Sequence, residues 1–95
     1  MKKTFSIKVT NKTPERQVDT IKHEIKKYLA RERRKETPEK VDFWDFDCRI
    51  GESSTQAEVI NVADINSHIS KLLEDNKEAF YLEILARPGY KTRKS

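Results

Sequence analysis

The segment DFWDFDCRIG at residues 42–51 is the most informative stretch of the chain. Its apolar residues Trp44, Phe46, Cys48 and Ile50 recur at every second position, the period of a strand with one buried face. We expect Trp44 to be the central anchor of the core. The opposite face of this strand carries the alternating residues Phe43, Asp45, Asp47 and Arg49.

The same reading extends to both sides of this strand. Before it, residues 3–9 alternate like a strand, and a helix is predicted over 14–36, with Thr13-Pro14 as its start signal. After it, a polar turn leads into a second strand at 56–62, so a hairpin is predicted. A helix at 64–76 and a strand at 79–87 follow, with Pro88-Gly89 as the stop.

This element order predicts one α+β domain. The order is β-α-β-β-α-β, which most simply gives a four-stranded antiparallel sheet with both helices on one face. We therefore expect the ferredoxin-like arrangement, whose usual strand order is 4-1-3-2. Residues 1–87 would form the domain, and residues 88–95 a basic, frayed tail.

Length and composition exclude several classes of protein. The 95 residues fit one small domain, and no apolar run is long enough to span a bilayer. The start MKKTFSIKV lacks the apolar stretch of a signal peptide, and the single cysteine, Cys48, fits a reducing compartment. We expect a cytoplasmic protein with no membrane contact. With only Gly51 and Gly89, no glycine-rich nucleotide loop is present, and we expect no small-molecule cofactor.

Positive charge gathers in two segments. Residues 22–40 carry eight basic and four acidic side chains and residues 87–95 four and none, a net +4 each, whereas residues 41–86 carry three and ten, a net −7. Such clusters neutralise phosphates and predict contact with RNA, a ribonucleoprotein or another polyanion. The alternative is a solvated face with cations that favour the helix C-terminus. The candidate residues are Lys26, Lys27, Arg31, Arg33, Arg34, Lys91, Arg93 and Lys94.

The sheet face that no helix covers is a second candidate surface. Phe43, Tyr81 and Leu85 make it half apolar, which suggests a protein partner or a homodimer. Its two aromatics stand among three acids, Asp45, Asp47 and Glu83. These acids repel phosphate and disfavour the base stacking that proteins use to bind single strands. The candidate interaction face comprises Phe43, Asp45, Asp47, Arg49, Tyr81 and Leu85.

Catalytic chemistry has weaker support than binding. Asp45 and Asp47 point the same way, as metal-binding carboxylates do in phosphoryl-transfer enzymes. In a 4-1-3-2 sheet, however, Glu83 would lie three strand spacings away, about 14 Å. The alternative is a charged edge strand with Arg49 as the ion-pair partner of the acids.

Neither the cysteine nor the histidines form a recognisable catalytic or metal-binding pattern. Cys48 on the core face is expected to be a small apolar filler. His23 and His68 lie on separate helices without the spacing of a zinc site. We expect a non-catalytic protein with no metal ligands.

Three segments resemble a known family. They are IKHEIKKYLARERRK at 21–35, VDFWDFDCRIG at 41–51 and YLEILARPGYKTRK at 81–94. In these segments the chain is similar to a family of small bacterial proteins of unknown function. The resemblance implies a compact cytoplasmic protein of about this length, and it implies no activity, cofactor or catalytic residue.

Overall fold

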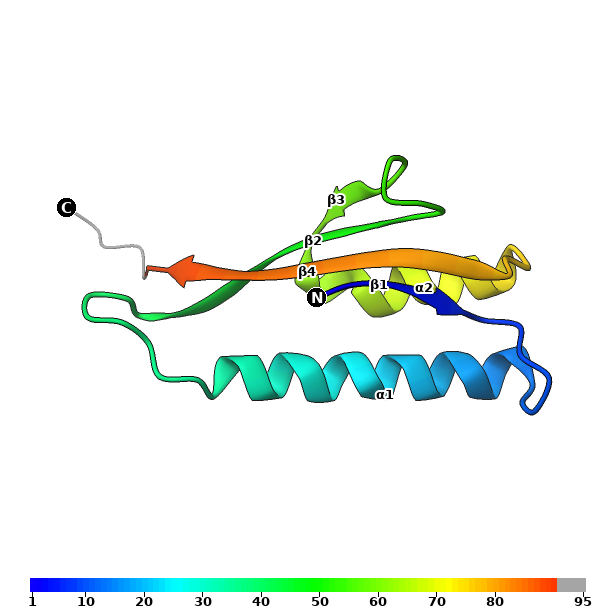
Figure 1. Cartoon of the computed structure of the whole chain (residues 1–95), viewed down its shortest axis with the longest axis horizontal. Coiled ribbons are helices and arrows are strands. Elements are labelled where there is room, and N and C mark those ends of the chain that lie inside the picture. The colour runs from blue at the N-terminus through cyan, green and yellow to red at the C-terminus, as the bar shows by residue number, and fades with distance from the viewer. Residues whose placement is uncertain (91–95) are drawn as a thin grey trace.

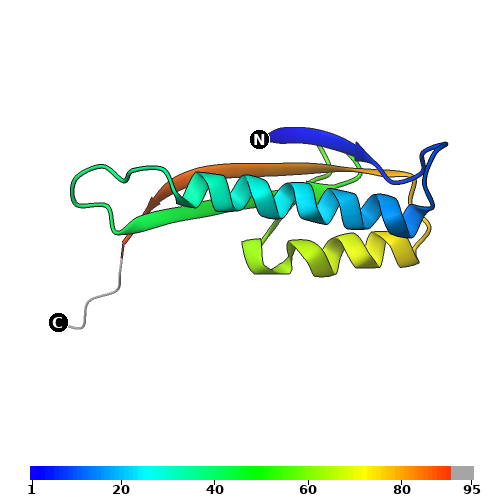
Figure 2. The ribbon, with the colours of Figure 1, turned by 90° about the horizontal axis from the view of Figure 1, so that it is seen from below.

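An open four-stranded sheet with two helices on one face forms the structure, a computed structural model that describes residues 1–90 (Figure 1). Figure 2 shows both helices side by side in front of the sheet. The elements, in chain order, are β1 (Lys2–Ser6), α1 (Pro14–Arg33), β2 (Phe43–Gly51), β3 (Glu58–Ile60), the 3-10 turn η1 (Val62–Asp64), α2 (Ile65–Glu74) and β4 (Ala79–Gly89). The α+β class, the element order and the antiparallel sheet are confirmed.

Helix α1 begins where the sequence predicts. The Thr13 hydroxyl accepts the Arg16 amide at 3.3 Å and Pro14 occupies the first turn, so two of the helix's start requirements are met locally. Its end comes at Arg33, three residues before the predicted limit. The chain then turns back, and the Lys35 carbonyl accepts the indole N–H of Trp44 at 3.0 Å.

The core lies between the sheet and the two helices. The alternating residues of β2 and β4 point into it, and Phe80 at its centre stacks on Phe5 of β1, with 5.3 Å between the ring centroids. The helices contribute Val18, Ile21, Ile25, Leu29, Ile65 and Ile69. The prediction that Trp44 is the central anchor is wrong, because Trp44 is only half-buried and packs against the core from outside.

The predicted strand order 4-1-3-2 is also wrong. The order is β1-β4-β2-β3, so β4 and β2 form the centre and the first and third strands form the edges. The central strands are the longest, with 11 and 9 residues, whereas β1 has 5 and β3 only 3. Central positions satisfy backbone groups on both sides, so long apolar strands gain most from them.

Strand β4 continues past its predicted stop. Pro88 pairs with Trp44 and Gly89 pairs with Phe43, so both residues belong to the strand. A side chain at Gly89 would meet the Phe43 ring, which lies 2.3 Å from the Cβ position. Glycine here lets the ring cover the strand end. Residues 91–95 of the predicted tail lie outside the described residues.

Candidate functional site

The candidate basic residues near the C-terminal end of α1 are exposed. Within residues 1–90, no salt bridge engages the five candidate cations at this end of the helix: Lys26, Lys27, Arg31, Arg33 and Arg34. Lys35 differs from them, because its ammonium lies 2.6 Å from Glu32 and lowers the pKa of that carboxyl through a hydrogen bond. The five remaining cations keep their charge available to a ligand.

The structure divides these cations between two surfaces. Lys26 and Arg33 line a groove of about 420 Å³ between α1 and the start of α2, and Lys27, Arg31 and Arg34 lie outside it. Lys22, which belongs to the same basic segment, also lines this groove, together with His23 and Asn66, which the charge pattern does not mark for binding. Lys22, Lys26 and Arg33 are spaced by four and seven residues, which places them on one helical stripe. This spacing is the sequence signal that groups the three cations on one side of α1.

Two groove cations are held in place by neighbouring side chains. The Arg33 guanidinium lies over the Phe46 ring, 5.4 Å from its centroid, a cation–π distance. The Lys22 ammonium donates to the Ser70 hydroxyl of α2 at 2.6 Å. Asp19 adds one acidic side chain to the wall of the groove.

The C-terminal ends of α1 and β4 lie at the same end of the molecule (Figure 2). Trp44 ties β2 to the Lys35 carbonyl, and its neighbour Phe43 covers Gly89 at the end of β4. The basic end of α1 and the start of the tail, about 55 residues apart in sequence, are therefore neighbours. The tail candidates Lys91, Arg93 and Lys94 lie outside the described residues.

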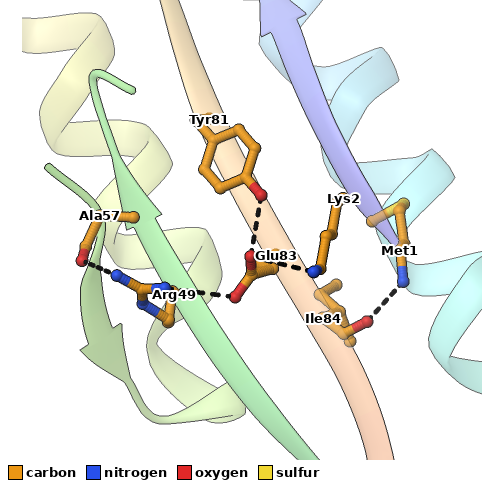
Figure 3. Close-up of polar contacts among 7 residues, drawn as sticks. All are labelled: Met1, Lys2, Arg49, Ala57, Tyr81, Glu83 and Ile84. Atoms are coloured by element: carbon orange, nitrogen blue, oxygen red, sulfur yellow. Dashed lines mark hydrogen bonds and ion pairs between the residues drawn. The ribbon is translucent and has the colours of Figure 1, made fainter. Parts of the chain in front are cut away.

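The open sheet face carries a network centred on Glu83 of β4 (Figure 3). The Tyr81 hydroxyl donates to its carboxylate at 2.8 Å, and Arg49 on β2 lies 3.6 Å away. Lys2 approaches at 4.0 Å from β1, and Arg49 also donates to the Ala57 carbonyl at 2.9 Å. Glu83 is only 9% exposed, and these neighbouring groups balance its charge within the sheet.

Glu83 also changes the pKa of the neighbouring Tyr81 hydroxyl. Its hydrogen bond with Tyr81 raises the pKa of that hydroxyl, and burial and the carboxylate charge act in the same direction. The Tyr81 hydroxyl is therefore a donor, not a nucleophile, at neutral pH.

The two acids on β2 share one cation. Arg87 of β4 contacts Asp45 at 2.8 Å and Asp47 at 2.9 Å, and Asp45 also accepts the Phe46 amide at 2.8 Å. The predicted pairing of Arg49 with these acids is wrong, because Arg49 faces Glu83. Glu83 is also closer than expected, on the strand adjacent to β2.

The donor set on this face gives a metal little to bind. Among residues 1–90, no group of three or more histidine, cysteine or acidic side chains is arranged to hold a metal ion. The hypothesis of a metal-dependent enzyme gains no support from this arrangement.

The apolar residues of the open face are scattered. Phe43 is 41% and Leu85 44% exposed, and they lie four residue pairs apart along the β2–β4 ladder. Val59 on the edge strand β3 is 81% exposed. Residues this far apart form no continuous patch, and single exposed apolar residues are ordinary on soluble domains.

Cys48 lies in the core, 1% exposed. Burial raises the pKa of its thiol to about 11, and the nearby charges of Asp47 and Asp45 add to this effect. A thiol with that pKa is not an activated nucleophile.

In the described part of the chain, neither helix has the length and apolarity to cross a bilayer. Comparison with curated proteins and with solved structures finds no match. A family model does match, over residues 1–95, which confirms the resemblance to a family of unknown function. The chain belongs to the family of unknown function DUF6172.

Proposed function

We propose that this protein is a non-catalytic module that binds RNA through the basic residues of α1 and the C-terminal tail. The supporting observation is the set of five exposed cations that make no salt bridge within residues 1–90. Phosphate contacts of this kind release counterions and are independent of base sequence. Other polyanions share this chemistry and would compete for the same surface.

The setting we propose is the bacterial cytoplasm. Cys48 is a free, buried thiol in the structure, and the remainder of the chain offers no second cysteine for a disulfide.

Salt dependence gives the first test of RNA binding. If about five phosphates are contacted, the logarithm of the affinity for a single strand falls with a slope of about −3.5 against the logarithm of salt. Raising salt from about 50 to 200 mM then weakens binding by about a hundredfold. Fluorescence anisotropy with a labelled 20-nucleotide RNA measures this, and no binding at the lower salt refutes the proposal.

A matched pair of variants locates the surface. The triple variant Lys27→Gln, Arg31→Gln, Arg34→Gln removes three charges from the outer side of α1. The control, Lys8→Gln, Lys12→Gln, Lys71→Gln, removes three exposed charges from outside the last turns of α1. We expect the first variant to lose at least about tenfold in affinity and the control less than about threefold. Equal losses would contradict a localised surface.

The second candidate function is protein interaction or dimerisation through the open sheet face. Its contact residues would be Phe43 and Leu85, the exposed apolar side chains of that face on β2 and β4. Light scattering at high protein concentration tests the homodimer, which Leu85→Lys should dissociate. A monomer at every concentration removes that version, and pulldown with the same variant tests a different protein partner.

A further inference from the structure

We infer that the groove between α1 and α2 seats the sugar–phosphate backbone of a single strand, so that the protein prefers single-stranded to duplex RNA. This inference rests on the proposed function and names the substrate form that the site selects. Its basis is the separation of the helix cations into a set that lines the groove, Lys22, Lys26 and Arg33, and a set that lies outside it, Lys27, Arg31 and Arg34.

The cations that line the groove are preorganised for phosphate. Lys22, Lys26 and Arg33 share one stripe of α1 and face the same concavity. The cation–π contact with Phe46 restrains the position of the Arg33 guanidinium, a group that can make forked contacts to phosphate. The bond to Ser70 fixes Lys22 without neutralising it. The lysine and arginine side chains therefore lose little conformational entropy when a ligand binds.

The charges that line the groove are mostly positive. Ile65 and Asn66 of the first turn of α2 form its opposite wall, where Asp64 at the N-cap offsets the partial positive charge of the helix end. Asp19 is the acidic side chain of the lining, and the three cations outnumber it. The lining is therefore net positive and favours an anion.

The recessed shape separates single strands from duplexes. A volume of about 420 Å³ is at the lower end of the range of ligand pockets and suits a group the size of one nucleotide. A single strand can bend its backbone into such a concavity, whereas a duplex holds its phosphates in a regular, rigid helix. The exposed cations Lys27, Arg31 and Arg34 can contact either form.

The test places a negative charge in the groove without removing a cation. Asn66→Asp introduces it at the groove wall, and Ser67→Asp introduces the same charge at the next, exposed position, outside the lining. Both positions are in the first turn of α2, where an acidic residue is compatible with the helix dipole. Both variants are therefore expected to fold.

We expect Asn66→Asp to weaken binding of a single-stranded 20-nucleotide RNA by about fivefold or more and to change binding of the 20-base-pair duplex by less than about twofold. Ser67→Asp should change both by less than about twofold. A loss of single-strand binding of under twofold for Asn66→Asp, or an equal loss for the duplex, overturns the inference. If the native protein binds both forms, that outcome leaves the proposed function standing.

A second pair of variants gives an independent check. Lys26→Gln with Arg33→Gln empties the groove of two charges, and Lys27→Gln with Arg34→Gln removes two from the outer side. The groove pair should lower the ratio of single-strand to duplex affinity by about threefold or more, and the outer pair should leave that ratio unchanged. Equal ratios overturn the inference, and no binding of either RNA by the native protein refutes the proposed function itself.

Discussion

The last turns of α1 and the open sheet face both carry many charges, but the charges on the sheet form ion pairs and most of those on the helix do not. On the sheet, Arg87 contacts two aspartates at 2.8 and 2.9 Å, and Glu83 is surrounded by Tyr81, Arg49 and Lys2. On the helix, five cations make no salt bridge within residues 1–90. Paired charges stabilise the fold and offer little to a ligand, whereas unpaired charges are available for one. Substitutions on the two surfaces should therefore change different properties.

Removing the helix charges should have the largest effect, and it should be on binding. The variant with glutamine at positions 26, 27, 31, 33 and 34 is expected to lose at least about a hundredfold in RNA affinity. Its free energy of unfolding should change by less than about 1 kcal/mol, since the lost helix-end interactions are small. Anisotropy and urea denaturation measure the two quantities. Unchanged affinity would remove the helix from the binding surface.

Glu83→Gln should have the converse effect. It leaves Arg49 and Lys2 without their counter-charge and weakens the bond from Tyr81, which should lower the free energy of unfolding by about 2 kcal/mol. RNA affinity should stay within about twofold. Glu74→Gln, at an exposed position on α2, is the control and should change stability by less than about 0.5 kcal/mol. Loss of RNA affinity in Glu83→Gln would give the sheet face a binding role.

Alkaline pH should destabilise the core through Cys48. Its thiol ionises near pH 8.5 in the unfolded chain but near 11 in the fold, so the unfolded state releases the proton first. The stability from the protonated thiol is complete below about pH 8.5 and is lost as pH rises toward 11, by up to about 1 kcal/mol at pH 9. Urea denaturation at pH 7 and 9 measures this, and Cys48→Ala should show a shallower decline. The same slope in both proteins would contradict it.

Arg87→Gln should have the smallest effect. Its contacts with Asp45 and Asp47 are on the exposed side of the sheet, where ion pairs contribute between zero and about 1 kcal/mol. We expect a loss of about 0.5 kcal/mol by urea denaturation, well below that of Glu83→Gln. A loss equal to that of Glu83→Gln would mean that burial does not distinguish the two charge clusters.

Local patterns predicted the elements better than their arrangement. The alternation in residues 42–51 and the Thr13-Pro14 start depend on neighbours in sequence, and both are confirmed. Strand order depends on which backbones meet across the sheet. The greater length of the apolar alternation in β2 and β4 is the sequence feature that agrees with their central positions, whereas the ferredoxin-like order does not.

The candidate sites show the same division. The basic residues of α1 were identified from composition alone, but the groove depends on where α2 packs, which composition does not contain. Likewise, the pairing of Arg87 with Asp45 and Asp47 depends on β4 lying beside β2, which the alternation within each strand does not contain. The alternation predicts that Trp44 is apolar and faces the core, but not that it lies near the start of β2. There it is half-buried and its indole N–H donates to the Lys35 carbonyl of the loop after α1.

Mapping the RNA contact by NMR is the most direct test of the contrast between the two surfaces. On titration of the isotope-labelled protein with single-stranded RNA, the account predicts amide shifts in residues 22–34 and little change at Arg49, Tyr81 and Glu83. Shifts concentrated on the open sheet face, with residues 22–34 unmoved, would contradict it.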